Sequence, residues 1–286
     1  YWIADFRDLL VDPYFNHLYF NKPHQSLFKA IFKRADVITT VSEGLAEQLK
    51  KYNPNVIVVK NGIVNFSGRF IPIPTSLFTM AYTGSMYLDK KNAKPLFVAL
   101  KELLEENKIQ KENLSIIYAG KDPAYWQKLA SEFDLDSLLD VRGFLSTEEA
   151  IEIQKKACIN ILLSISSDEQ TGILTGKMIE YFAAGNPILA LVAQQIDPEL
   201  EQLLDKLNIG KSFSDQPSDI AGIKDFIFKE YNHWKSSGTN RIAVDIGVLK
   251  NNYAIEVTMK ELYERIGIQS SIYPLPPEKG AWIKLI

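Results

Sequence analysis

Short apolar runs alternate along this chain with amphipathic stretches, a pattern typical of strands and helices around a parallel sheet. A first series of elements occupies the opening part, with strands predicted at residues 2–6, 37–41 and 56–60 and helices at residues 21–34 and 42–50. A longer second series has strands predicted at residues 78–82, 114–119, 139–142, 159–164 and 188–192. Its helices are predicted at residues 93–106, 124–133, 148–157, 175–184, 198–207, 218–234 and 252–266. The sequence therefore predicts an α/β protein with two groups of βα units.

The two series indicate two domains of unequal completeness. We divide the chain into residues 1–66, a linker at 67–76, a doubly wound Rossmann-like domain at 77–250, and a terminal helix and tail at 251–286. Three strands are too few for a complete sheet domain, and the chain starts inside an apolar strand with no initial Met. We therefore expect the first domain to be incomplete here, with further residues upstream.

Composition narrows the class of protein. The chain has 286 residues, of which 46% are apolar and 23% charged, as in ordinary globular proteins. Its 32 Lys and Arg and 35 Asp and Glu give a formal net charge of −3, which offers no global field for nucleic acid. A single cysteine, Cys158, allows no internal disulfide, and no apolar run is long enough to span a membrane. We expect a cytoplasmic protein.

The most informative segment is residues 164–189, which runs from a buried strand through a polar, glycine-containing loop into a helix. In doubly wound sheets, ligands bind beyond the carboxyl ends of strands and against helix N-termini. Lys177 falls in the first helical turn, where a cation is disfavoured by about 0.3–1 kcal/mol unless an anion binds there. Glu180, one turn later, can accept hydrogen bonds from two neighbouring sugar hydroxyls. The alternative is an exposed Lys177–Glu180 ion pair, worth about 0.2–0.5 kcal/mol.

Three other loops place a glycine directly after a predicted strand. Gly84 follows the first strand of the second series, with Lys90 six residues later, and Gly120 and Gly143 follow the next two strands. Each loop alone is an ordinary turn. Four such loops in order, on the same edge of a parallel sheet, indicate a phosphate-containing ligand.

This ordered set resembles the carboxy-terminal domain of GT-B glycosyltransferases, specifically the large retaining group 1 (family 4-like). That family has Gly-Arg followed by Lys after the first strand, glycines after the next two, and Glu-x7-Glu before an Ala-x-Gly-x-Pro strand entry. The matches are Gly84 with Lys90 or Lys91, Gly120, Gly143, and Glu180 followed by residues 181–187. Upstream, residues 35–42 and 60–62 resemble the last βα units of the family's acceptor domain.

The chain departs from the family pattern at two positions. Gly172 stands where the family has the first glutamate, so a carboxylate near the transferred sugar is absent, and Asp168 or Glu169 of the same loop is a candidate replacement. Ser85 stands where the family has Arg, which leaves Lys90 or Lys91, with Lys177 or Arg142, as the charge on the diphosphate.

The resemblance implies two incomplete-plus-complete Rossmann-like domains and an enzyme, a hexosyltransferase or related transferase, acting in bacterial polysaccharide biosynthesis. It would move a sugar from a nucleotide-sugar to a glycan or lipid-linked acceptor, with retention and without a metal ion or other cofactor. The implied donor-binding residues are Gly84, Ser85, Lys91, Gly120, Gly143, Gly172, Leu174, Thr175, Gly176 and Glu180. The implied catalytic residues are Lys90, Lys177, Arg7 and Asp8, the last two facing the interdomain cleft or else forming a surface ion pair at a strand end.

The implied partners are the nucleotide-sugar donor, the acceptor and, through a lipid-linked acceptor, the inner face of the membrane; nucleic acid is not expected. Two alternatives remain open. One is a GT-B nucleotide-sugar 2-epimerase, whose carboxylate and histidine catalysts we do not find. The other is a catalytically silent nucleotide-sugar-binding subunit, which the missing carboxylate at Gly172 favours.

Overall fold

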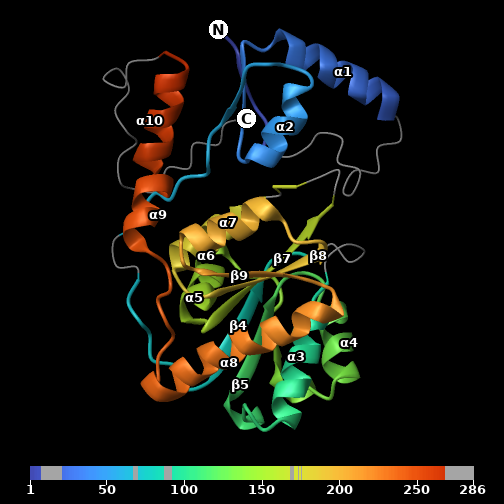
Figure 1. Ribbon diagram of the computed structural model, residues 1–286, viewed down its shortest axis with the longest axis vertical. Helices are drawn as coiled ribbons and strands as arrows, with labels where there is room; N and C mark the ends of the chain where they lie inside the picture. Colours follow the sequence, from blue (N-terminus) through green and yellow to red (C-terminus); the bar gives the residue numbers. More distant parts are fainter. Residues whose placement is uncertain are drawn as a thin grey trace. The chain divides into compact units, whose positions relative to one another are not determined.

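The structure is a computed structural model (Figure 1) that describes residues 1–7, 21–66, 70–86, 92–167, 171–172, 174 and 176–267. The chain forms two compact units. One comprises Tyr1–Ser67 and Gly247–Ile286, and the other comprises Gly68–Ile246. Each unit has its own parallel sheet, so the α/β class expected from the sequence is confirmed.

The first unit contains a three-stranded parallel sheet in the order β1-β2-β3, which confirms the three predicted strands of its described part. The strands and the helices between them are β1 (Ile3–Asp5), α1 (Asn21–Arg34), β2 (Val37–Thr40), α2 (Glu43–Lys50) and β3 (Val56–Val58). Helix α2 begins after Ser42, whose Oγ accepts a hydrogen bond from the Leu45 backbone N–H at 3.2 Å. This cap satisfies one of the unpaired N–H groups at the start of the helix.

The prediction of a single last helix at residues 252–266 is wrong. The structure has two helices, α9 (Ile246–Tyr253) and α10 (Ile255–Arg265), separated by the extended residue Ala254. The Ile63 N–H donates to the Tyr253 carbonyl at 2.6 Å, and the Ile255 N–H donates to the Ile63 carbonyl at 3.1 Å. This bridge to a distant segment takes the backbone groups that a continuous helix would have used for itself.

The second unit contains a six-stranded parallel sheet in the order β6-β5-β4-β7-β8-β9. Its strands are β4 (Phe78–Thr83), β5 (Leu114–Ala119), β6 (Leu139–Val141), β7 (Ile159–Ser166), β8 (Ile188–Gln194) and β9 (Gly210–Ser214). The sequence did not predict β9, whose segment Gly-Lys-Ser-Phe-Ser holds a single large apolar residue. It is a strand because β8 supplies a partner along its full length.

The helices of this unit follow from the strand order. They are α3 (Lys94–Glu105), α4 (Ala124–Glu132), α5 (Thr147–Lys156), α6 (Gly176–Ala184), α7 (Pro198–Lys206) and α8 (Ile220–Ser237). The sheet grows outward from β4 in one direction to β6 and in the other direction from β7 to β9. Because crossovers between parallel strands are right-handed, this reversal places the connecting helices of the two halves on opposite faces.

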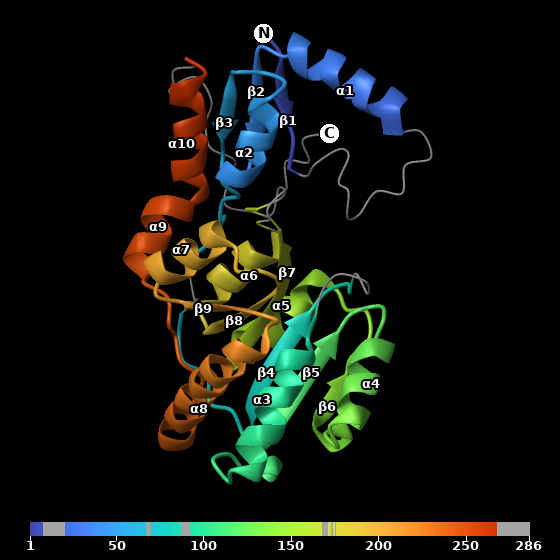
Figure 2. The same cartoon turned by 45° about the vertical axis from the view of Figure 1, so that its right-hand side comes forward.

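The main hydrophobic core lies between the sheet and helices α3, α4 and α8. Figure 2 shows α3 and α8 alongside each other, and their apolar residues share one buried cluster with the strands. Cys158 is buried within this cluster as a free thiol, as expected from the sequence. Among the helices of the described ranges, none combines the length and the apolar character needed to cross a membrane.

Candidate functional site

The loops that the sequence predicts at one edge of the second sheet do lie at one edge. Strands β4 to β7 are parallel, so their carboxyl ends share a side of the sheet. Gly84, Gly120 and Gly143 follow β4, β5 and β6 within two residues, and the loop before α6 follows β7. The edge includes the point between β4 and β7 where the strand order reverses, which is the place where open α/β sheets bind ligands.

Gly84 and Gly120 bring two of these loops into direct backbone contact. The Gly84 N–H donates to the Ala119 carbonyl at 2.7 Å. A Cβ on Gly120 would lie 2.2 Å from the Gly84 carbonyl oxygen, and Gly84 itself has φ +130°. Residues with a side chain rarely adopt such a φ or allow such an approach, so both positions require glycine. The result is an edge made of backbone rather than side chains.

Lys177 reaches this backbone from the start of α6. Its Nζ lies 1.5 Å from the position that a Cβ on Gly84 would take, so the ammonium occupies the space that the glycine leaves. The same Nζ is 5.0 Å from the centroid of the Tyr82 ring, within the range of a cation–π interaction. The structure thus brings together Gly84, Gly120 and Lys177, three residues that are separated widely in sequence.

An aromatic group that the sequence analysis missed supports these loops from below. Tyr82 and Tyr118 are register partners on β4 and β5, with stacked rings 5.8 Å apart, and both pack on Trp126. The Tyr82 hydroxyl donates to the Ser85 carbonyl at 2.9 Å, and the Tyr118 hydroxyl accepts from the Asp122 N–H. Each ring therefore holds the loop that follows its own strand. The signal was a Tyr-x-Gly spacing shared by Tyr82–Gly84 and Tyr118–Gly120.

Glu180 lies one turn into α6 and is held by a residue of α5. The Gln154 side-chain amide donates to Glu180 Oε2 and to Thr83 Oγ1, both at 2.9 Å. Thr83 is the last residue of β4, and its N–H donates to the Tyr181 hydroxyl at 3.3 Å. Tyr181 in turn donates to the Ile161 carbonyl at 3.1 Å. This network ties the Glu180 carboxylate to the end of the strand that precedes Gly84.

Burial fixes the protonation state of Tyr181. Its side chain is fully buried, which disfavours the charged phenolate and raises the pKa of Tyr181 to about 12. The hydroxyl therefore remains a donor throughout the ordinary pH range.

Gly172 and Leu174 belong to the described part of the loop between β7 and α6. The Gly172 N–H donates to Asp197 Oδ2 at 2.7 Å, and the Leu174 N–H donates to the Gly172 carbonyl at 2.9 Å. Asp197 is fully buried and caps α7 through Oδ1, which accepts from the Glu199 and Leu200 N–H groups. A carboxylate that the sequence analysis missed thus holds the backbone of position 172.

The loop after β6 is more open. Arg142 is paired with Asp140 through Nε at 2.8 Å, so its charge is offset by a neighbouring carboxylate. A Cβ on Gly143 would meet no atom within 4 Å. Phe144 is 75% exposed, with the Lys121 ammonium 5.0 Å from its ring centroid. Gly143 does not share the close backbone contact of Gly84 and Gly120.

Arg7 follows β1 in the first unit and is the described member of its predicted pair. Its Nε donates to Asp5 Oδ2 at 2.8 Å, and its guanidinium also donates to Asn61. Asp5 Oδ1 accepts from the Thr39 hydroxyl at 2.7 Å. These side chains join the carboxyl ends of β1 and β2 to the turn after β3.

Some predicted residues are placed at the ends of described segments or fall outside them. Ser85 lies in the loop held by Tyr82, and Gly176 is the first residue of α6, with open space where a Cβ would stand. The predicted site residues outside the described ranges are Asp8, Lys90, Lys91 and Thr175. The two candidate replacements for the missing glutamate, Asp168 and Glu169, also lie outside them.

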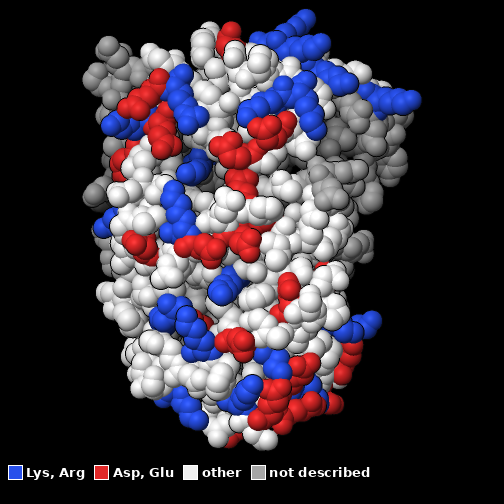
Figure 3. Space-filling model, viewed as in Figure 1, with Lys and Arg blue, Asp and Glu red and all other residues white. Residues whose placement is uncertain are grey.

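Two further features bear on what this edge can bind. Within the described ranges, His, Cys, Asp and Glu form no cluster that could hold a metal ion. On the face shown in Figure 3, positive and negative side chains are interspersed, so no large field of one sign dominates it. Recognition at the edge therefore depends on local groups such as Lys177.

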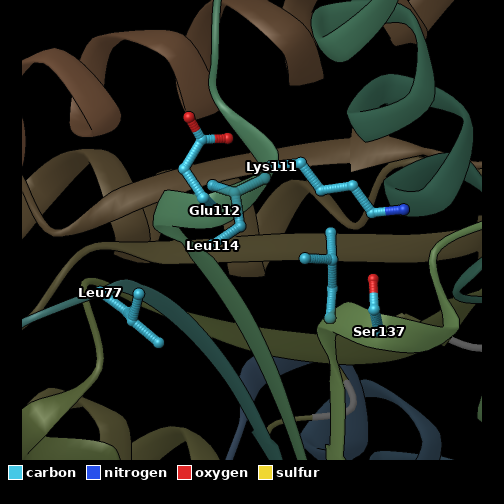
Figure 4. A pocket seen from close by; sticks show the side chains of 6 residues that line it. Leu77, Lys111, Glu112, Leu114 and Ser137 are labelled. Carbon is cyan, nitrogen blue, oxygen red and sulfur yellow. The ribbon is translucent and has the colours of Figure 1, made fainter.

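A pocket of about 520 Å³ lies elsewhere in the second unit (Figure 4). It is lined by Leu77, Lys111, Glu112, Leu114, Ser137 and Leu138. Leu114 is the first residue of β5 and Leu138 precedes β6, so this pocket lies at the amino ends of the strands. It is separate from the glycine loops at the carboxyl ends.

No protein-family model and no curated protein matches the chain, whereas solved structures do match. Lipopolysaccharide outer core galactosyltransferase WaaB is 14% identical, with a TM-score of 0.58, over 82% of this chain and 62% of that one. TarM from S. aureus is 10% identical, with a TM-score of 0.62, over 92% and 50%. WaaG, a glycosyltransferase of lipopolysaccharide biosynthesis, is 15% identical, with a TM-score of 0.58, over 94% and 75%.

These similarities concern the fold. The chain spans 62% of the length of WaaB and 50% of that of TarM. The matched proteins are GT-B glycosyltransferases with Rossmann-like domains, and the parallel sheets of both units agree with theirs. The fold of this chain is therefore the GT-B fold.

Proposed function

We propose that this chain carries the donor site of a glycosyltransferase, which moves a sugar from a nucleotide-sugar to a glycan or lipid-linked acceptor. The observation that carries the proposal is the position of the Lys177 ammonium against the backbone of Gly84. An ammonium at a helix start is unfavourable by about 0.3–1 kcal/mol on its own. A diphosphate at this edge reverses that sign, because it meets the ammonium, the start of α6 and the glycine backbone together.

The fold supports this reading of the site. TarM was solved in complex with UDP, and the GT-B protein GtfA was solved in complex with UDP and GlcNAc. Proteins of the same fold thus hold a nucleoside diphosphate. In this chain the topological switch point, the glycine loops and Lys177 all lie at one edge of the second sheet.

Each group has a distinct part in the proposed reaction. Departure of the nucleoside diphosphate leaves negative charge on its phosphates, and a fixed ammonium stabilises that charge as it develops. Glu180, fixed by Gln154, accepts hydrogen bonds from the ribose hydroxyls and so orients the nucleotide. Gly84 and Gly120 allow the diphosphate to approach the backbone without meeting a side chain.

We extend the proposal to the finer features that the sequence resemblance implies. Transfer proceeds with retention and needs no metal ion, because Lys177 supplies positive charge at the leaving group. Lys90, Lys91 and Thr175 add further contacts to the diphosphate. The sugar is a hexose or a related sugar. The acceptor is a bacterial surface glycan or its lipid-linked precursor, and the second case brings the protein to the inner face of the membrane.

Nucleotide binding tests the proposal directly. Calorimetry with uridine, guanosine, adenosine and thymidine diphosphates should show that one of them binds. Lys177→Ala should weaken that binding by about 1.5–3 kcal/mol, the range for hydrogen bonds to charged groups. Its melting temperature should change little, because the lost cation–π contact with Tyr82 is offset by relief of the unfavourable dipole interaction.

Lys128→Ala is the matched control, since Lys128 is an exposed lysine on α4 of the same unit. It should leave affinity unchanged. The absence of binding by all four nucleotides at millimolar concentration would contradict the donor site. Wild-type affinity in Lys177→Ala would remove the role of Lys177.

Product analysis then separates transfer from the alternatives. Mass spectrometry of a panel of nucleotide-sugars incubated with the protein should detect free sugar and nucleoside diphosphate, because water replaces a missing acceptor. A donor epimerised at C2 would identify an epimerase instead. Binding without any turnover would favour the silent subunit.

A further inference from the structure

The residue that helix α5 buries is polar. Gln154 is 1% exposed and is the one buried residue of α5, the other side chains of which are half-buried or exposed. Its position belongs to the apolar stripe of the helix, together with Ala150, Ile151 and Ala157, at spacings of three and four residues. An amphipathic helix that only packed against its domain would present a hydrophobic residue there.

Gln154 also carries a cost that stability does not require. Within the described part of the chain, its Oε1 atom is buried without a hydrogen-bond partner. A buried acceptor without a partner loses its hydration and gains nothing in return. A methionine or leucine of similar size would avoid this loss. The side chain is therefore poorly explained by packing alone.

What the amide does make are two short hydrogen bonds toward the proposed donor site. Its Nε2 donates to Glu180 Oε2 and to Thr83 Oγ1, each at 2.9 Å. Thr83 immediately precedes Gly84, whereas Glu180 lies on α6 and is exposed. Gln154 thus connects an exposed carboxylate to the end of a buried strand.

The end of α5 is itself held firmly in place. The Asn186 side chain donates to the carbonyls of Gln154, Lys155 and Ala157 at 2.7–2.9 Å. Asn160 donates to the Gln154 carbonyl at 3.1 Å, and Asn240 donates to the Lys155 carbonyl at 2.6 Å. These three amides satisfy carbonyls that a helix end otherwise leaves unpaired. The backbone that carries Gln154 is therefore anchored from three directions.

We infer that Gln154 is a positioning residue that fixes the Glu180 carboxylate for the ribose diol of the donor, and so helps the site to select a ribonucleotide. A glutamate on the surface of a helix samples several rotamers, and two hydrogen bonds to a diol require one of them. Gln154 holds that rotamer through Oε2 without touching the substrate itself. This inference rests on the proposed donor site and adds to it the means by which Glu180 is oriented.

The experiment compares a nucleoside diphosphate with its 2′,3′-dideoxy counterpart, using a base for which wild-type binding has been measured. The wild type should prefer the intact ribose by about tenfold or more, as expected for hydrogen bonds to a charged group. Gln154→Met should reduce this preference to about threefold or less, while affinity for the dideoxy compound stays within about twofold. In a Glu180→Gln background, the same change should have no further effect on the ratio.

Tyr231→Phe is the matched control for the loss of a buried polar group. The Tyr231 hydroxyl accepts hydrogen bonds from Gln110 and Asn113, near the amino end of β5. This variant should lower the melting temperature and keep the wild-type preference for ribose. If Gln154→Met does not fold, Thr83→Val removes the other partner of the amide while retaining Gln154, and it should reduce the same preference partially.

The outcomes separate the inference from the function on which it rests. A wild type that binds both nucleotides equally would refute the role of Glu180 in the proposed site, and the inference with it. A wild type that prefers ribose, together with a Gln154→Met or Thr83→Val protein that keeps the full preference, would overturn the inference alone and make Gln154 structural.

Discussion

The two units end their parallel strands in different ways. In the second unit, the edge of the sheet consists of the glycine backbone at positions 84 and 120 with the Lys177 ammonium placed against it. In the first unit, the corresponding edge consists of side chains that bind one another, with Arg7 held by Asp5 and Asn61. The first arrangement places positive charge and backbone at the edge, whereas in the second the charges already neutralise each other. The same sheet topology can therefore produce an edge suited to an anion or an edge that is already satisfied.

The largest effect should come from the closest backbone contact of the second unit. Gly120→Ala places a methyl group 2.2 Å from the Gly84 carbonyl oxygen, and neither backbone can move away without breaking the pairing of β4 with β5. We expect the free energy of unfolding to fall by about 3 kcal/mol, with loss of nucleotide binding. Chemical denaturation measures the first quantity and calorimetry the second.

Gly176→Ala serves as the control, because a Cβ at this position meets no atom within 4 Å and the residue is helical. It should be neutral or stabilise the protein by up to about 1 kcal/mol. Equal stability of the Gly120→Ala and wild-type proteins would mean that the edge does not depend on close backbone contact.

An intermediate effect is expected from Tyr181, which joins α6 to the end of β4. Tyr181→Phe removes the hydroxyl that accepts from Thr83 and donates to Ile161, and should cost about 1–2 kcal/mol at neutral pH. The pKa of Tyr181 is raised by burial to about 12, above its unfolded value of 10. The folded state therefore holds this proton longer than the unfolded state does.

The contribution of this proton to stability is complete below pH 10 and is lost as the pH rises toward 12. A shift of this size corresponds to about 2–3 kcal/mol. Denaturation curves between pH 9 and pH 12 should show a smaller alkaline loss in Tyr181→Phe than in the wild type. Parallel alkaline profiles for the two proteins would contradict a buried, neutral Tyr181.

The smallest effect should come from the first unit. Arg7→Ala breaks the contacts with Asp5 and Asn61, but the Arg7 side chain is 45% exposed. Exposed ion pairs contribute little, so the free energy of unfolding should change by about 0.5 kcal/mol or less. A loss as large as that of Tyr181→Phe would show that the side-chain edge matters more to stability than the comparison of the two units implies.

The sequence predicted the parallel sheet and the edge that carries the glycine loops, because alternating apolar and amphipathic segments determine both. It also singled out Lys177 and Gly84 separately, from their helix position and strand-end position. Their contact could not be predicted, since it depends on how α6 packs beside β4. Strand β9 and the break at Ala254 were missed for a related reason: each depends on a hydrogen-bonding partner that is distant in sequence.

The residues that support the site were harder to find than those that form it. Gln154 looks like an ordinary polar residue of a surface helix, and only its place in an apolar stripe marks it. Asp197 looks like a helix cap, which it is, and its second bond to Gly172 depends on a loop more than twenty residues away. Such dual roles arise from tertiary structure and leave only a weak local pattern.

The three asparagine side chains at the end of α5 also bear on the order in which the chain folds. Asn160 lies on β7, Asn186 follows α6, and Asn240 is 85 residues beyond the Lys155 carbonyl that it contacts. Such distant partners become available only after the intervening chain has closed a long loop, which carries an entropic cost. The last turn of α5 therefore becomes fully hydrogen-bonded only when the second unit is nearly complete. The amide that orients Glu180 is thus set in place late, so ribose selectivity is acquired at the end of folding rather than with the first strands.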